Sequence, residues 1–363
     1  MRSPRSFLTV LAPVVLVAAI ALVGSLFERS TEIYFINALV AVSIVVALYV
    51  FVGNSGVVSF GHIAFVAVGA WTAGVLSVPV EEKPATMPSL YGFLGDTTVG
   101  NVPSLLLAAL VGGLFALLAG LPLMRLSGLA AGIATFAVLE ITSNILRYYE
   151  RIGPGLNVFS SVPETTDMQQ AVIGAVVAIG VAFAYQVSRY GRQLRAARDD
   201  APAARAVGIS VYRQRLIAFG LSGALAGFAG GLYVHYLPIN VDAVYLDHTF
   251  ITLAMLVIGG MTSLWGAVVG ALAVSGLDSL LAEAENGAVG IDLPSGSRIV
   301  VVGALMTLVL ILRPEGITGG RRRRERHEDL RRRLRSGGIA VRGEPRDPRR
   351  RRGMGVRFEQ IAC

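Results

Sequence analysis

The sequence predicts an all-α fold, a polytopic integral membrane bundle of eight to ten transmembrane helices. Hydrophobic residues make up 54% of the 363 residues and charged residues only 15%, whereas soluble domains have about 45–50% and about 25%. The mean hydropathy is +0.63. Uncharged apolar runs of about 20 residues recur along the chain, and a helix needs about that length to cross the hydrocarbon layer. These observations indicate a membrane protein.

Each apolar run is a predicted span. The first is expected to be retained rather than cleaved as a signal peptide, because its core is longer than about 7–15 residues and no A-x-A-like site follows it. The run at 249–276, 28 residues interrupted by IGGMTSLWG, predicts two short spans or a re-entrant hairpin turning at Gly259 and Gly260. In chain order the runs cover 7–27, 33–52, 56–79, 103–124, 127–146, 169–187, 214–236, 249–276 and 299–312.

The connections between these runs separate by charge. Seven arginines lie between Arg189 and Arg215, while the connections at 80–100 and 277–297 are acidic. Cytoplasmic loops of membrane proteins carry the excess of Lys and Arg. We therefore expect both termini and the 188–213 loop in the cytoplasm, and 80–100 and 277–297 outside.

Two domains are predicted, a membrane domain at 1–320 and an Arg-rich tail at 321–363. The tail has 16 arginines against 6 acidic residues, whereas 1–320 has 16 basic and 18 acidic residues. With few large apolar residues the tail cannot bury a core, which predicts disorder or a fraying helix. Anionic membrane lipids are its expected partner, and no nucleic-acid binding is expected.

The 188–213 loop contains its own helix signals. Asp199 or Asp200 is suited to the N-cap, Pro202 to the first turn and Gly208 to the left-handed position after the end. Such a helix has about two turns and is not stable alone in water. It is therefore expected either to pack on its own membrane domain or to dock on another protein. Its side chains are mostly small, and only one of them is charged: Ala203, Ala204, Ala206 and Val207 lie beside Arg205.

The remaining candidates lie within the spans. Glu140 is either a functional carboxylate or a structural one bonded to Asn144. His62, in SFGHIAF, is expected to have one of two settings. It lies either at a glycine-interrupted helix that exposes backbone groups to a substrate, or at a capped helix kink. Gly- and Ala-rich stretches such as GLSGALAGFAGGLY predict close helix packing, which a substrate path also needs.

The motif content separates three classes of function. ATP binding needs G-x-x-x-x-G-K-[ST], and the only lysine is Lys83 in the acidic connection, so this chain is not expected to hydrolyse ATP. An ion-coupled transporter or channel is the rival class, although it usually places ionisable groups in mid-membrane. An intramembrane hydrolase would need a nucleophile with its base, or H-E-x-x-H, and neither pattern occurs. No cofactor or metal is expected.

Five stretches in order resemble one family. PAARAVGIS matches the Ala-Ala-x-x-x-Gly core of the loop by which ABC importer permeases engage their ATPases, with Pro202 in place of the usual glutamate. In chain order the five stretches are GNSGVVSFGHIAFVAVGAWTAG, LSGLAAGIATFAVLEI, GRQLRAARDDAPAARAVGISVYRQRLIAFGLSGALAGFAGGLY (which contains PAARAVGIS), VIGGMTSLWGAVVGA and LRPEGITG. Over about residues 30–319 the chain is similar to the M-type (LivM) permease subunit of branched-chain amino acid ABC importers. RIGPGLNVF and the Arg-rich tail depart from the family pattern.

The resemblance implies a transport subunit of the bacterial inner membrane and its assembly. The implied partners are a homologous H-type permease, two cytoplasmic ABC ATPases and an extracytoplasmic substrate-binding protein. The implied substrate is leucine, isoleucine or valine, with urea or a short amide as the alternative. The residues implied to couple to the ATPase are Arg198, Asp199, Asp200, Ala203, Ala204, Arg205 and Gly208. Motif match and intramembrane position together give the expected substrate path, Ser59, Phe60, Gly61, His62, Glu140, Gly259 and Gly260.

Overall fold

The computed structural model describes residues 4–26, 29–285, 294, 296–312 and 316–318. All regular structure in this part of the chain is helical, which confirms the predicted all-α membrane fold. The predicted disorder of the 321–363 tail lies outside the described residues. Ten apolar helices account for the predicted spans: α1 Pro4–Gly24, α2 Arg29–Ser55, α3 His62–Ser77, α6 Asn101–Leu123, α7 Leu129–Tyr148, α8 Met168–Val187, α11 Val211–Val234, α12 Leu246–Gly259, α13 Leu264–Glu285 and α14 Ser297–Leu312.

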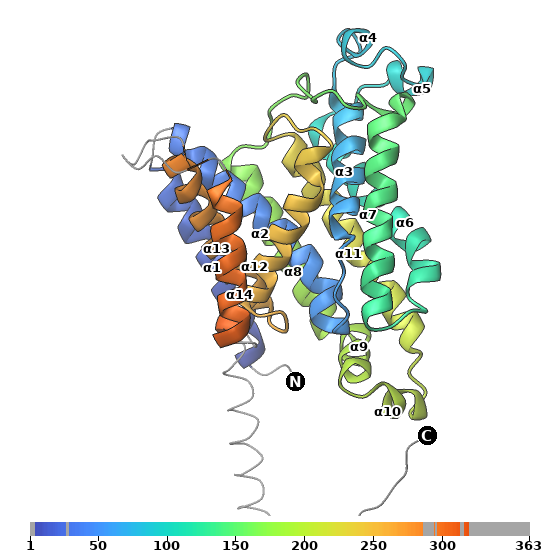
Figure 1. The fold of residues 1–363 in the computed structure, drawn as a ribbon, viewed down its shortest axis with the longest axis vertical. Coiled ribbons are helices and arrows are strands. Elements are labelled where there is room, and N and C mark those ends of the chain that lie inside the picture. Colours follow the sequence, from blue (N-terminus) through green and yellow to red (C-terminus); the bar gives the residue numbers. More distant parts are fainter. Residues whose placement is uncertain (1–3, 27–28, 286–293, 295, 313–315, 319–363) are drawn as a thin grey trace, which may run out of the picture. The chain divides into compact units, whose positions relative to one another are not determined.

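Short elements lie at the two ends of the bundle. The helices α9 (Arg189–Asp199) and α10 (Ala201–Ala206) extend from one end, which we call the loop end. The helices α4 (Lys83–Thr86) and α5 (Gly92–Gly95) lie at the other, which we call the cap end (Figure 1). Single turns of 3-10 helix, η1 (Glu150–Ile152) and η2 (Asp242–Val244), belong to the remaining connections.

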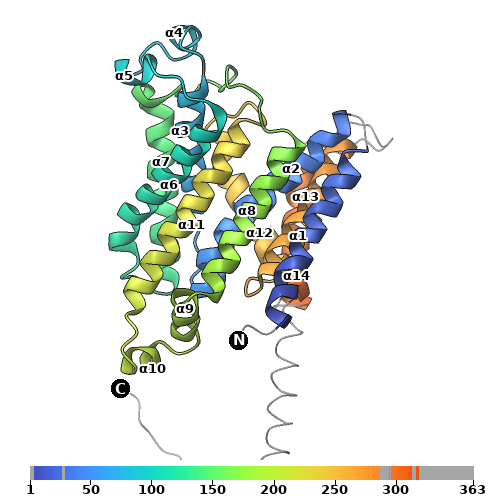
Figure 2. The same cartoon turned by 180° about the vertical axis from the view of Figure 1, so that it is seen from behind.

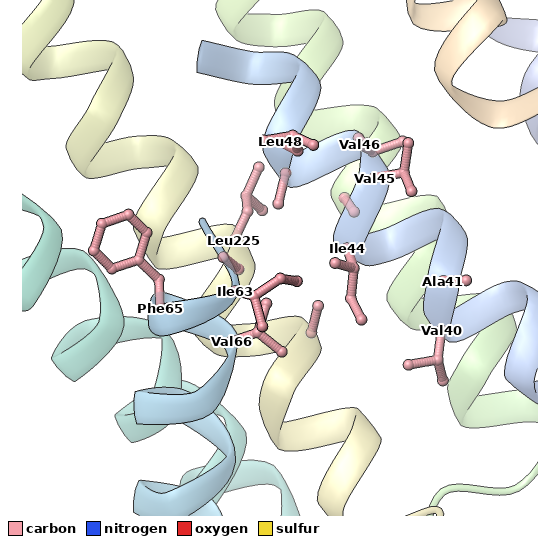
Figure 3. Close-up of a cluster of buried hydrophobic side chains, with 14 of the residues drawn as sticks. Val40, Ala41, Ile44, Val45, Val46, Leu48, Ile63, Phe65, Val66 and Leu225 are labelled. Carbon is pink, nitrogen blue, oxygen red and sulfur yellow. The ribbon is translucent and has the colours of Figure 1, made fainter. Parts of the chain in front are cut away.

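Two helices form the centre of the bundle. In the most apolar 18-residue stretch of each helix, 89% of the residues are buried in α2 and 72% in α11, against 39% in each of α6, α7 and α8. The helices α3 and α6 pack on α11, whereas α8 and α13 pack on α2. In Figures 1 and 2, α3 and α6 lie with α11 on one side of the bundle, α8 and α13 lie on the other, and α2 runs obliquely across it. In Figure 3, Ile44 and Leu48 of α2 lie near Ile63 of α3 and Leu225 of α11.

Small residues let α11 approach its neighbours at backbone distance. A Cβ atom at Gly227 would overlap the carbonyl oxygen of Ala108 in α6, and one at Gly230 would overlap that of Val66 in α3. Lipid offers helices no hydrophobic drive to associate, so close van der Waals contact of this kind stabilises the bundle. The predicted close packing of the Gly- and Ala-rich stretches is confirmed.

The connection between α2 and α3 enters the bundle without helical structure. Residues 56–61, predicted as the start of a span, are irregular, and α3 begins only at His62. The backbone N–H of Phe60 donates to Thr135 Oγ1 of α7 at 3.2 Å. Irregular backbone at membrane depth is tolerated where protein covers it, and here α7 covers one side of the segment.

The predicted span at 249–276 is two helices. α12 ends at Gly259 and α13 begins at Leu264. A Cβ atom at Gly53, two residues before the end of α2, would lie 2.6 Å from the carbonyl oxygen of Met261. The α12–α13 turn therefore reaches the level at which α2 ends, so this hairpin crosses most of the bundle. Among the described residues, seven apolar helices have 18 or more residues and three are shorter, which favours ten spans over eight.

The glycine contact of α11 predicts that adding one methyl group lowers stability at a packed glycine but not at an open one. Gly227→Ala should destabilise the bundle by about 1–3 kcal/mol, because overpacking forces two backbones apart. Gly180→Ala in α8 is the matched control, since the space around its Cβ position is open and alanine favours helix. Retention of the monodisperse protein after heating in detergent measures the difference. Equal stability of the two variants would contradict the proposed packing.

The alternation of ten helices predicts which residues share a side of the membrane. We expect Glu81→Cys at the cap end to react with an impermeant thiol reagent in intact cells, and Ala206→Cys at the loop end to react only after permeabilisation. Both variants are made in the Cys363→Ser background, which removes the only native cysteine. Labelling of Ala206→Cys in intact cells would reverse the assigned orientation.

Candidate functional site

The loop end is organised by α9, a helix that the sequence analysis did not predict. Ser188 caps it, with its hydroxyl accepting from the Gly191 N–H at 3.2 Å. Gly191, Leu194 and Ala197 are buried at a spacing of three residues, so one narrow apolar stripe faces the bundle. The high arginine content hid this stripe, although the i, i+3 pattern was a signal that could have found it.

The short helix α10 forms as its local signals predict. The Asp200 side chain is the N-cap and accepts from the Ala203 N–H at 2.9 Å. Pro202 lies in the first turn, where a missing N–H is tolerated. Gly208 has φ +84°, a left-handed conformation that glycine adopts without strain. The predicted cap, start and stop of this helix are confirmed.

One residue that was expected on the surface of α10 is buried in the structure. Ala204 is only 5% exposed, in a small core with Ala197 of α9 and Val211 of α11. Its side chain therefore packs inside the loop and not on the exposed face, and its role in coupling stays a prediction. Val207 is 75% exposed, and the sequence analysis did not count it among the coupling residues. The exposed residues of this segment are Pro202, Ala203, Arg205, Ala206, Val207 and Gly208.

Two arginines of α9 hold the last turn of α2. Arg198 donates from Nη1 to the Gly53 carbonyl oxygen at 2.6 Å, and Arg195 donates from Nη1 to Asn54 Oδ1 at 2.8 Å. The last carbonyl groups of a helix lack intrahelical donors and form its negative pole, so guanidinium groups suit this place. Gly56 follows with φ +71°, and a Cβ atom there would lie 2.7 Å from Arg198 Cγ. We call Arg195 and Arg198 with the end of α2 the arginine clamp.

The two aspartates predicted to act in coupling have separate local roles. Asp200 caps α10, as described above. Asp199 pairs with its neighbour Arg198, Oδ1 to Nη2 at 3.3 Å, and the side chain of Asp199 is 58% exposed. An exposed ion pair of this kind contributes little to stability, so the clamp depends mainly on the bonds from Arg198 to the backbone of α2.

His62 lies in a closed box at the start of α3. Its ring stacks on Phe51 at a centroid distance of 5.7 Å and contacts Phe65 and Phe219 edge-on, each at 5.5 Å. Nδ1 lies 2.8 Å from Ser59 Oγ, and Nε2 lies 2.6 Å from Ser222 Oγ in α11. Both ring nitrogens are therefore bonded, and the side chain joins α3 to α2 and α11.

The hydrogen-bond pattern assigns the tautomer of His62. Ser222 Oγ also lies 2.5 Å from the Ala47 carbonyl oxygen of α2, and a carbonyl only accepts. The single hydroxyl proton of Ser222 is thus committed to Ala47, so Nε2–H of His62 donates to Ser222 Oγ. Nδ1 then accepts the hydroxyl proton of Ser59. One neutral imidazole in this way links three central helices.

The other predicted path residues have different neighbours. A Cβ atom at Gly61 would overlap the Thr135 carbonyl oxygen of α7, and Gly259 is packed against the backbone of α13. Glu140 lies on the exposed face of α7, where Asn144 Nδ2 donates to Oε1 at 2.8 Å and Tyr245 OH donates to Oε2. The predicted bond between Glu140 and Asn144 is confirmed. The structure thus joins Ser59 to His62, but it shows no contact of these residues with Glu140 or with the α12–α13 turn among the described interactions.

The cap end is fixed by polar contacts that the sequence did not reveal. Lys83 is 1% exposed, and its Nζ donates to the carbonyl oxygens of Leu94 at 2.7 Å and Thr97 at 2.5 Å. Burial lowers the pKa of Lys83, and the nearby carboxylate of Asp96 opposes this shift. Arg147 at the end of α7 pairs with Asp242 of η2 at 2.6 Å. In the described part of the chain, no group of three or more His, Cys, Asp or Glu side chains is placed to hold a metal ion.

Comparison with known proteins finds relatives of similar sequence. The chain is 27% identical over 305 residues to the high-affinity branched-chain amino acid transport system permease protein LivM of Salmonella typhimurium, and equally to that of Escherichia coli. Each match covers 74% of this chain and 65% of the relative, so the chain spans slightly less than two thirds of these proteins. The probable permease LivH of Methanocaldococcus jannaschii is 30% identical over 144 residues, covering 39% of this chain and 44% of the relative. No solved structure matches significantly.

A protein-family match covers most of the membrane helices. The family described as "Branched-chain amino acid transport system / permease component" matches residues 30–310. This range begins in α2 and ends in α14, and it includes the arginine clamp, α10, the His62 box and Glu140. The chain therefore belongs to the permease component family of branched-chain amino acid transport systems.

Proposed function

We propose that this chain is the membrane-spanning subunit of an ABC importer that brings leucine, isoleucine or valine into the cytoplasm. Family membership supports the transport class, and the names of the LivM and LivH relatives support the substrate. The single observation that carries the coupling role is α10, a capped helix at the loop end with small exposed side chains. An ion-coupled transporter would need no such surface, and the family match disfavours it. Urea or a short amide is the alternative cargo.

The proposed assembly contains three kinds of partner protein. A LivH-type permease would pair with this chain in the inner membrane, two ATPases would bind at the cytoplasmic loop end, and a binding protein would deliver substrate to the cap end. Both termini would then be cytoplasmic, since ten spans return the chain to the side on which it began. The similarity of part of the chain to LivH proteins is consistent with a pair of related permeases.

The contacts at the loop end offer a route for ATPase motion into the membrane. Val207 and its exposed neighbours on α10 would meet the ATPase, while Ala204 ties α10 to α9 and α11. The arginine clamp then joins α9 to the end of α2. Beyond it lies the irregular 56–61 segment and the His62 box. A displacement of α9 would therefore shift the junction of α2 and α3, where no continuous helix resists a change of angle.

The proposed docking face predicts that a substitution on it weakens ATPase binding without lowering the stability of the permease. Val207→Asp should abolish co-purification of the ATPases and stimulated ATP hydrolysis, because it places a charge on an exposed apolar contact. The thermal stability of the purified permease pair should change by less than about 0.5 kcal/mol, as for other surface substitutions. Wild-type ATPase binding by Val207→Asp would reject α10 as the docking surface.

Ala204→Glu is the matched contrast on the neighbouring buried position. It adds volume and charge inside the small core with Ala197 and Val211, so it should lower the stability of the permease pair by several kcal/mol or prevent its isolation. If Ala204→Glu instead kept full stability and lost only the ATPases, Ala204 would belong to the contact after all.

The arginine clamp predicts uncoupling without loss of assembly. Arg198→Ala removes the charged donor to the Gly53 carbonyl oxygen, and such bonds contribute about 1.5–3 kcal/mol. We expect the ATPases to remain bound and to hydrolyse ATP, while amino acid uptake per ATP falls about tenfold or more. Arg192→Ala is the control, since Arg192 is an exposed arginine on the same helix. Equal transport stoichiometry in Arg198→Ala and wild type would contradict the route.

A further inference from the structure

The exposed face of α7 carries polar side chains in the middle of apolar ones. Ile133, Phe136, Ile141 and Ile145 are all exposed, and Glu140 lies among them with Asn144. The neighbouring helix α6 is just as open, yet its exposed side chains are all apolar: Val102, Pro103, Leu106, Leu107, Leu110, Val111, Leu114, Leu117, Leu118, Leu121 and Pro122. Lipid suits the α6 face. A carboxylate in a span faces a cavity, a path or a partner, so the α7 face has a different neighbour.

A groove runs along this face of α7. It is open, has a volume of about 430 Å³ and is lined by Glu140, Ile141, Asn144, Ile145, Tyr148 and Tyr149. All six residues come from α7 and the residue that follows it, so the groove has one wall only. The wall combines a carboxylate and an amide with two isoleucines and two aromatic rings. It matches a small ligand that has a cationic group next to an apolar one.

Two neutral donors orient the carboxylate of Glu140, and Arg147, the cation that acts on it electrostatically, is paired with another carboxylate. Asn144 and the Tyr245 hydroxyl, both neutral donors, each bond one of its oxygens. A carboxylate oxygen has two acceptor positions, so each oxygen keeps one for a further donor. Arg147, about two turns further along α7, is paired with Asp242 at 2.6 Å. The site therefore fixes an anionic group toward the groove and leaves room for a cation.

We propose that Glu140 binds the ammonium group of the transported amino acid. The apolar side chain of that amino acid lies on Ile141, Ile145 and Tyr148, and the partner permease supplies the opposite wall. This assignment rests on the proposed importer function and narrows it, because a neutral urea or amide would gain nothing from the carboxylate. Asn144 and Tyr245 act as positioning residues that hold the carboxylate in its rotamer.

The experiment uses the complete transporter, with its partner permease, ATPases and binding protein, in proteoliposomes. A photoreactive leucine that carries a diazirine in its side chain is the probe, and both its uptake and the site of its crosslink by mass spectrometry are measured. In the wild type we expect crosslinks between residues 141 and 149. In Glu140→Gln, a change of charge at nearly constant shape, we expect uptake to fall roughly 10- to 100-fold and these crosslinks to disappear.

Controls separate this role from a structural one. Glu164→Gln makes the same chemical change in an exposed connection at the cap end and should leave uptake and crosslinking at the wild-type level. Glu140→Gln should keep wild-type thermal stability and full co-purification of the partner permease and the ATPases. Wild-type uptake by Glu140→Gln, loss of the partner permease from it, or an absence of wild-type crosslinks at residues 141–149 would each overturn the assignment. Failure of the wild-type transporter to take up any amino acid would instead reject the proposed function itself.

Discussion

The backbone contact of α11 with α3 and α6 is the constraint on which the bundle depends. Helices in lipid gain little from burying apolar side chains against each other, so proximity itself must supply the attraction. Glycine at 227 and 230 allows that proximity, and it brings Ser222 of α11 within reach of both α2 and α3. The hydrogen bonds of His62 are thus available only because the helices around it are already close.

Two sets of polar groups in the membrane domain have different surroundings. Those around His62 are enclosed and satisfied, as buried polar groups must be, and they fix how three helices meet. Those of the arginine clamp and of Glu140 lie at the surface of the described helices, where they can meet water or a partner. Stability and transport are in this way assigned to different side chains, even though both sets belong to the matched family region.

Sequence reasoning predicted the apolar helices because their run lengths follow from the thickness of the membrane. It also predicted the cap and stop of α10, since Asp200 and Gly208 act through their own backbone. It could not predict the burial of Ala204 or the partners of Arg198, because these depend on how distant segments pack. Three of the proposed path residues, Glu140, Gly259 and Gly260, share a motif match with His62 and yet have other neighbours. Motifs identify which residues matter to a family, but they carry no distances.

The burial of Lys83 has a consequence for chemical work on the folded protein. The sequence has no other lysine, and this one is enclosed with its ammonium group donating to two carbonyl oxygens. Amine-directed esters and lysine-specific proteases therefore meet no accessible lysine side chain in the native fold. Chemical modification of Lys83 would therefore show that the connection between α3 and α6 has opened.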